Sequence, residues 1–131
     1  MKLISDTPSL GFLVVEDDTV AAIDLECILE DMGHTVIAVA MSSKAAAKAL
    51  EKHRAKVDAV IFGATIVGLP AFPLARSLIE TGCPSVVTSA HPEEVVRALG
   101  FSEPFLAKPY VRLEAGRIVR ALEDQIVISA A

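Results

Sequence analysis

The chain has 131 residues, a net charge of −5 and a mean hydropathy of +0.52. This length suits a single domain over residues 1–131, with a core over about 10–125. The acidic balance argues against nucleic acid as a partner, because phosphate binding needs clustered lysine and arginine and the basic residues form no run. We find neither a signal peptide nor a membrane-spanning apolar stretch, and we expect a soluble, cytoplasmic protein.

The two cysteines, Cys27 and Cys83, are isolated in the sequence and form no CxxC motif. No histidine stands near either one at the spacing of metal ligands. We expect both side chains to be buried and reduced, as is usual in a cytoplasmic protein, and we prefer this to a disulfide.

The predicted elements begin with a buried strand over 11–15, which ends at an acidic cluster. Asp18 or Thr19 can cap the helix that follows, and Gly33 can end it. Apolar positions recur along this helix at helical spacing and should face the core: Val20, Ile23, Cys27, Ile28 and Met32.

A second strand over 34–39 follows, and a pair of serines then opens an alanine-rich helix over 44–53. The next apolar run predicts a third strand over 57–62. Two glycines and a proline make 63–70 a loop rather than a regular element.

The last part of the chain repeats the same alternation. We predict helices over 72–80, 93–99 and 111–124, with strands over 85–88 and 104–107 between them. The apolar positions of the last helix include Leu113, Ile118 and Leu122.

Five strand–helix units in a row predict one α/β domain. Such alternation requires parallel strands joined by right-handed crossovers, which gives a doubly wound sheet between two layers of helices. In these folds the functional edge is formed by the carboxyl ends of the strands.

The residues expected at that edge suit a bound cation and a phosphoryl group. Glu16 and Asp17 follow the first strand, Ser89 and Ala90 the fourth, and Lys108 the fifth. Carboxylates are the ligands that Mg²⁺ prefers, while a hydroxyl and an ammonium group bind phosphate oxygens.

Four segments together resemble the receiver domain of response regulators in bacterial two-component signalling. They are Val-Val-Glu-Asp-Asp at 14–18, Asp-Ala-Val-Ile-Phe-Gly at 58–63, Ser-Ala at 89–90, and Phe-Leu-Ala-Lys-Pro-Tyr at 105–110. Each segment lies at the carboxyl end of one of the predicted strands, in the order and at the separations typical of that family. The resemblance implies a flavodoxin-like (βα)5 sandwich with sheet order 2-1-3-4-5.

The resemblance also assigns roles by position. Glu16 and Asp17 would be the acidic pair that holds Mg²⁺, here a weak site if any. Ser89, Ala90 and Lys108 would form the phosphoryl pocket, with a cis bond between Lys108 and Pro109. Phe105 matches the aromatic switch position, and we place Tyr110 with it.

The sequence departs from the family at the residue that accepts the phosphoryl group. The family has an aspartate five residues after Asp58, where this chain has Gly63. An acyl phosphate needs a carboxylate nucleophile, and glycine has no side chain. Asp58 itself lies roughly 16 Å back along an extended strand. We therefore expect no ordinary phosphorylation, although a hydroxyl such as Thr65 stays open as an atypical acceptor.

The loop after Gly63 is apolar where the family usually has polar residues. Ile66, Val67 and Leu69 either collapse onto Phe72 or present a contact patch. Both alternatives are open, and we place Ile66 and Leu69 among the candidate interface residues.

We expect a pseudo-receiver that is not an enzyme and acts by binding proteins. The partner would be a histidine kinase, a phosphotransfer protein or an output protein, and a homodimer is open. Intact relatives suggest a contact face formed by the fourth helix, fifth strand and fifth helix. Two alternatives are a receiver that still signals by phosphate and a flavodoxin-like domain for a small ligand. The latter is disfavoured because residues 15–19 lack a glycine-rich phosphate loop.

Overall fold

The computed structural model describes residues 9–130 and contains a central five-stranded parallel sheet. The sheet order is β2-β1-β3-β6-β7, which is the predicted order 2-1-3-4-5 for the five long strands along the chain. Its strands are β1 (Gly11–Val15), β2 (Thr35–Ala40), β3 (Ala59–Gly63), β6 (Ser85–Ser89) and β7 (Phe105–Ala107).

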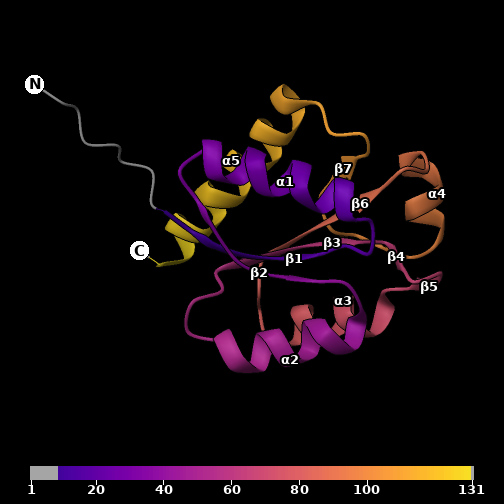
Figure 1. Cartoon of the computed structure of the whole chain (residues 1–131), viewed down its shortest axis with the longest axis horizontal. Coiled ribbons are helices and arrows are strands. Elements are labelled where there is room, and N and C mark those ends of the chain that lie inside the picture. The colour runs from indigo at the N-terminus through magenta and orange to yellow at the C-terminus, as the bar shows by residue number, and fades with distance from the viewer. Residues whose placement is uncertain (1–8, 131) are drawn as a thin grey trace, which may run out of the picture.

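Helices cover both faces of the sheet, as a doubly wound fold requires (Figure 1). They are α1 (Thr19–Asp31), α2 (Ser43–His53), α3 (Phe72–Glu80), α4 (Glu93–Ala98) and α5 (Arg112–Ala130). Helices α1 and α5 lie on one face, and α2 and α3 on the other. Among the described residues, no helix has the length and apolar character needed to cross a membrane.

Each face of the sheet has its own hydrophobic core because side chains alternate along a strand. In β1, Phe12 and Val14 point toward α1 and α5, while Leu13 and Val15 point toward α2 and α3. All residues of β1, β3 and β6 are buried, which accounts for their continuous apolar sequences.

The inward face of α1 differs from the prediction. The buried residues are Ala22, Leu25, Ile28 and Leu29, whereas Val20 is 77% exposed and Ile23 is exposed as well. The helix carries two apolar stripes of similar spacing. Packing against the sheet selects one of them, and the Asp18 cap, which accepts from Val20 N and Ala21 N, fixes where the helix starts.

The cysteines form no disulfide, as expected, but they are less buried than expected. Both thiols are free, but Cys27 is exposed on α1 and Cys83 is only partly buried. Cys27 is exposed because it belongs to the stripe of α1 that faces away from the sheet.

Two other elements differ from their predicted form. Residues 63–70 include a small antiparallel hairpin, β4 (Thr65–Ile66) and β5 (Leu69–Pro70), instead of an irregular loop. Helix α5 continues to Ala130, because neither glycine nor proline interrupts it after Asp124. Of the apolar residues on this helix, Leu113 is exposed and Leu122 is buried.

A buried polar pair joins α5 to the start of β2. His34 Nε2 lies 2.5 Å from Glu123 Oε1, and the backbone N–H of Leu10 donates to His34 Nδ1 at 3.0 Å. Because Nδ1 accepts this hydrogen bond, Nε2 carries the ring proton and donates a hydrogen bond to the carboxylate. The imidazole therefore satisfies two buried groups from distant parts of the chain.

We predict that His34→Ala lowers the free energy of unfolding by about 2–4 kcal/mol, because it leaves the Glu123 carboxylate and the Leu10 N–H buried without a partner. Urea denaturation measures this change. Asp124→Ala, at an exposed neighbouring position of α5, is the control and should change stability by no more than about 0.5 kcal/mol. Equal midpoints for both variants would show that the pair contributes nothing.

Candidate functional site

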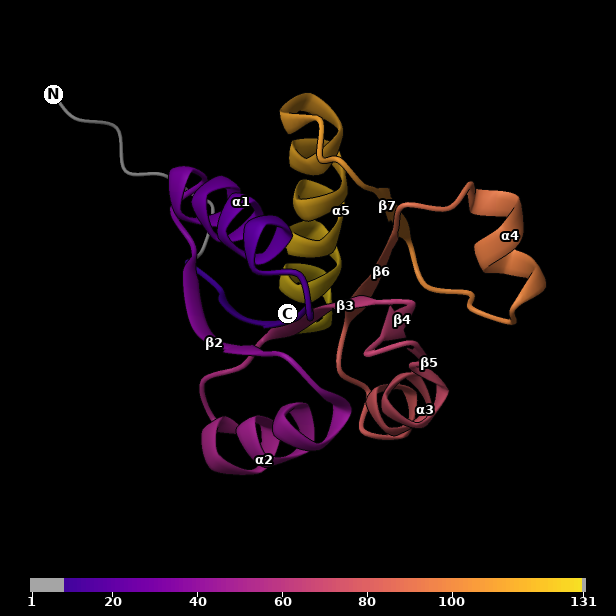
Figure 2. The ribbon, with the colours of Figure 1, turned by 45° about the vertical axis from the view of Figure 1, so that its right-hand side comes forward.

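The predicted site residues lie at the carboxyl ends of the parallel strands. Glu16 and Asp17 follow β1, Gly63 ends β3, Ser89 ends β6, and Lys108 follows β7. Figure 2 shows the β4–β5 hairpin between the end of β3 and α3, at this same edge.

An ion pair lies at the centre of this edge. Lys108 Nζ donates to Glu16 Oε1 at 2.8 Å, across 92 residues of sequence. The other carboxylate oxygen, Oε2, accepts from the backbone N–H of Asp18 at 3.0 Å. The Glu16 side chain is almost fully buried, so these two donors compensate its loss of water.

Asp17 is held by the hairpin instead of by a side chain. Its Oδ2 accepts from the backbone N–H of Val67 at 2.5 Å. This hydrogen bond is the main cause of a lowered pKa for Asp17. Desolvation raises the pKa, but the Val67 hydrogen bond, together with smaller contributions from Glu16 and from the charge of Lys108, lowers it by more. The site therefore keeps Asp17 ionised and bound to the protein itself.

The hairpin turn has an unusual conformation. Val67 has a φ of +53° and Gly68 a φ of +74°, so both central residues are left-handed. Glycine adopts this conformation without cost, but a β-branched valine is a genuine outlier there. The strained residue, Val67, is also the residue whose N–H binds Asp17. Strained backbone of this kind tends to occur at functional sites.

The apolar residues of the hairpin divide between core and surface. Ile66 is only 2% exposed, whereas Val67 is 65% and Leu69 69% exposed. The expectation that Ile66 belongs to a contact surface is therefore wrong, because Ile66 packs into the core beside α3. Leu69 is available for contact, and its role stays a prediction.

Gly63 lies in extended backbone next to the ion pair. It pairs with Thr88 of β6, and the preceding Phe62 pairs with Val15, the residue before Glu16. A Cβ at position 63 would lie 3.2 Å from the carbonyl oxygen of Thr65 and 3.9 Å from that of Val15. The first strand of the hairpin therefore lies against the position that a side chain at residue 63 would occupy.

The remaining predicted residues lie around this centre. The Ser89 hydroxyl accepts from His91 N at 3.0 Å, and Ala90 is exposed beside it. Phe105 is half-buried against the core next to α2 and α3. Tyr110 packs on the opposite core, where burial raises the pKa of its phenol. The bond between Lys108 and Pro109 is cis, as the resemblance implied.

The arrangement does not form a strong metal site. Among residues 9–130, no three histidine, cysteine or acidic side chains converge as metal ligands. Glu16 and Asp17 have the right chemistry for Mg²⁺, but Lys108 and the Val67 N–H already occupy oxygens of these carboxylates.

Sequence reasoning missed the part that Val67 plays. A backbone N–H has no sequence signature, so nothing in the motif pointed to it. The one available signal was Val-Gly between two apolar residues, which resembles the two-residue turn of a hairpin but has an unsuitable first residue.

Comparisons with known proteins give a fold assignment. No protein-family model matches the chain, and no curated protein sequence matches it. The response regulator PhyR from Brucella abortus is similar in structure, with a TM-score of 0.83 and 20% identity over 95% of this chain and 51% of that protein. The anti-anti-sigma factor PhyR from Bartonella quintana matches with a TM-score of 0.77 and 19% identity, over 95% and 51% of the two chains.

A third similar structure is SdrG from Sphingomonas melonis, with a TM-score of 0.75 and 24% identity over 87% of this chain and 96% of that protein. The chain thus spans about half the length of the two PhyR proteins and nearly all of SdrG. The class that these comparisons define is the receiver fold of response regulators.

The lowered pKa of Asp17 predicts an acid-dependent contribution to stability. A carboxyl group whose pKa is depressed by folding stabilises the protein above the ordinary aspartate pKa near 3.8, and this stabilisation is lost as the pH falls through the lowered value. Thermal unfolding should therefore show a difference between wild type and Asp17→Asn at neutral pH that shrinks in strong acid. Glu80→Gln, at an exposed position of α3, is the control. A difference that is constant with pH would contradict this account.

Proposed function

We propose that this domain is a receiver-type module of two-component signalling that acts by protein contact and does not accept a phosphoryl group on β3. One observation carries the proposal: glycine stands at the end of β3, beside an intact Glu16–Lys108 pair. The fold of response regulator receivers supports the signalling class.

With glycine at position 63, the charges of the site are balanced without a phosphoryl group. In a phosphate switch, a lysine at the position of Lys108 would have to be free to bind the incoming phosphoryl oxygens. Here its charge is already balanced by Glu16, whose carboxylate would be buried and unpaired if Lys108 moved away. The vestigial pocket of Ser89, Ala90 and Lys108 is thus stable without a ligand.

The hairpin supplies a second reason for a fixed state. The Val67 N–H holds Asp17, and Thr65 and Ile66 of β4 lie next to the position of the missing side chain. A domain with this closure can still respond to a partner, provided that the partner binds the closed and open hairpins with different affinities. Regulation would then come from binding instead of from phosphorylation.

A surface for a protein partner adjoins the site. Val20 and Ile23 are exposed on α1, and they line a groove of about 640 Å³ together with Tyr110 and Lys108. An exposed apolar surface with a charged rim is typical of protein contacts. In this proposal, the partner is a cytoplasmic signalling protein, and a second copy of the chain is the alternative.

We predict that Mg²⁺ binds weakly, with an affinity well below that of a site with three carboxylates. Binding would have to displace Lys108 from Glu16 or Val67 from Asp17, and within the described part of the chain no third carboxylate converges on them to offset this cost. A calorimetric titration with MgCl₂ tests the prediction, and amide NMR shifts of 16–18 and 63–68 locate any binding. Tight binding of one Mg²⁺ per chain would contradict it.

The proposal also predicts the response to a phosphoryl donor. Incubation with acetyl phosphate and Mg²⁺, followed by intact mass measurement, should leave the wild-type chain unmodified. Gly63→Asp should gain one phosphoryl group, because it supplies a carboxylate beside Lys108 once the carbonyl of Thr65 shifts by a few tenths of an ångström. Gly63→Ala is the matched control, since it adds the Cβ without the carboxylate.

Two outcomes would change the proposal. A wild-type chain that gains an acid-stable phosphate would favour an atypical hydroxyl acceptor, for which the exposed Thr65 is the first candidate. A Gly63→Asp chain that folds but stays unmodified would mean that Lys108 and Ser89 no longer form a phosphoryl pocket.

A further inference from the structure

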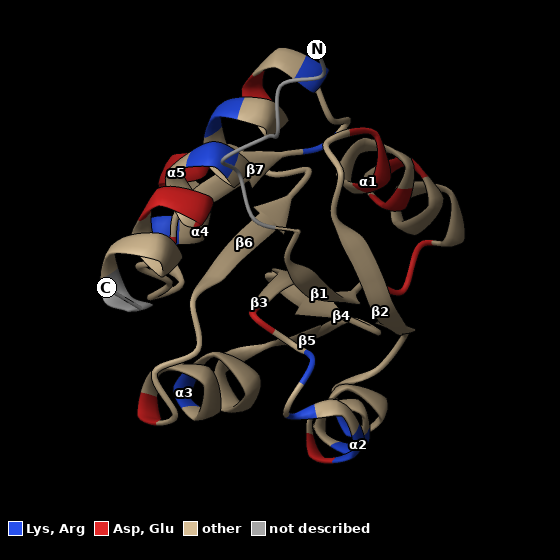
Figure 3. Cartoon of the chain, turned by 90° about the vertical axis from the view of Figure 1, so that its left-hand side faces the viewer, with Lys and Arg blue, Asp and Glu red and all other residues tan. Residues whose placement is uncertain are grey.

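Helix α2 is basic, although the chain as a whole is acidic. Lys44, Lys48 and Lys52 recur every four residues, and Arg54 and Lys56 follow directly. With Glu51 as its one acid, the segment 44–56 has a charge of +4 when His53 is neutral, so the rest of the chain has −9. All five basic side chains are exposed. Figure 3 shows the blue basic positions along α2.

These basic residues form no contiguous run, but residues four apart lie on one side of a helix, about 6 Å apart along its axis. The signal was present in the spacing of the lysines. Its significance depends on what lies next to α2 in the folded protein.

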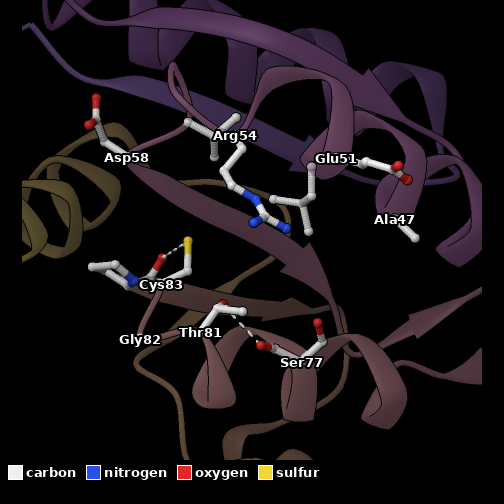
Figure 4. Close-up of a pocket in the computed structure, with 11 residues that line it drawn as sticks. Ala47, Glu51, Arg54, Asp58, Ser77, Thr81, Gly82 and Cys83 are labelled. Carbon is white, nitrogen blue, oxygen red and sulfur yellow. Dashed lines mark hydrogen bonds between the residues drawn. The ribbon is translucent and has the colours of Figure 1, made fainter.

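A cavity of about 840 Å³ opens between α2 and α3, beside the basic side of α2 (Figure 4). It lies at the amino ends of the strands, away from the Glu16–Lys108 pair. Its lining includes the apolar side chains of Leu50, Val57 and Pro84, together with the thiol of Cys83. Burial and, to a smaller degree, the charge of Asp58 raise the pKa of this thiol, so it stays neutral and the cavity can accept an apolar group.

Arg54 stands between the basic helix and this cavity. It occupies the C-cap position of α2, and among the described residues its side chain makes no hydrogen bond or ion pair. Its guanidinium group extends into the space between the helices, while the Glu51 carboxylate points away from it (Figure 4). Asp58 is engaged elsewhere, since its Oδ2 accepts from the backbone N–H of Gly11 at 2.8 Å.

We propose that this side of α2, together with the α2–α3 cavity, binds an acidic protein segment that carries an apolar anchor residue. Carboxylates of the partner pair with Lys48, Lys52 and Arg54, and the anchor side chain enters the cavity. Arg54 is suited to this because its planar guanidinium binds a carboxylate through two parallel hydrogen bonds. The surface is separate from the carboxyl edge, so it stands whether or not the proposed function holds.

Other polyanions fit this surface less well. The cavity lining has no aromatic side chain on which a nucleobase could stack, and the charge of −9 on the rest of the chain opposes a phosphate backbone. A lipid surface is disfavoured because the exposed residues of α2 are Lys, Ser, Glu and Ala, with no large apolar side chain to insert.

Selection from a displayed library of random peptides against the whole chain tests the proposal. The enriched peptides should be rich in Asp and Glu around a single apolar residue. Their affinity should fall about tenfold or more for the double variant K48E/K52E, and should also fall for Arg54→Ala. The variant R117E/R120E is the matched control, because it reverses two exposed charges on α5 and should leave affinity within about twofold.

Circular dichroism spectra and melting temperatures must be the same for wild type and for the charge variants, since all of these substitutions are at exposed positions. The substitution Cys83→Trp tests the anchor, because it fills the cavity. It should lower the affinity of the selected peptides, and K48E/K52E should still lower that affinity further. Enriched peptides without acidic residues, or peptides that bind wild type and K48E/K52E equally, would overturn the proposal. Tighter binding of single-stranded DNA or of anionic phosphatidylglycerol vesicles at the same lysines would replace it with another class of partner.

Discussion

The ion pair between Glu16 and Lys108 is the interaction on which the carboxyl edge depends. It joins the end of β1 to the end of β7, two strands that are not neighbours in the sheet. Because Glu16 is buried, its charge is tolerated only while Lys108 and the Asp18 N–H both donate to it. The pair therefore fixes the ends of both strands and at the same time neutralises the lysine that a phosphoryl group would need.

The β4–β5 hairpin completes this closed arrangement. A side chain at position 63 would compete with the Thr65 carbonyl for the same space, so glycine and the hairpin fit each other. The hairpin then offers the Val67 N–H to Asp17 at the cost of a left-handed valine. With this arrangement, the two acids of the site are satisfied by the protein itself, which suits a module controlled by its partners.

The site could be predicted in part. The residues that follow the strands were identified from the alternation of strands and helices, because the carboxyl ends of parallel strands must meet at one edge. Ile66 and Val67 could not be assigned in the same way. Whether an apolar loop residue packs inward or faces solvent depends on how the loop folds back, and the donor to Asp17 is a backbone group that any residue would have provided.

The sequence by itself determined the five long strands and the ends of the early helices, because apolar runs, caps and glycines act over a few neighbouring residues. The order of the strands in the sheet followed only from the resemblance to receiver domains. It also determined that position 63 has no nucleophile. Tertiary structure alone decided which apolar stripe of α1 is buried, that the carboxylate of Glu16 meets Lys108, and that Arg54 lies over a cavity between two helices. These outcomes depend on contacts between segments far apart in the chain, and local pattern contains no information on the distance between such segments.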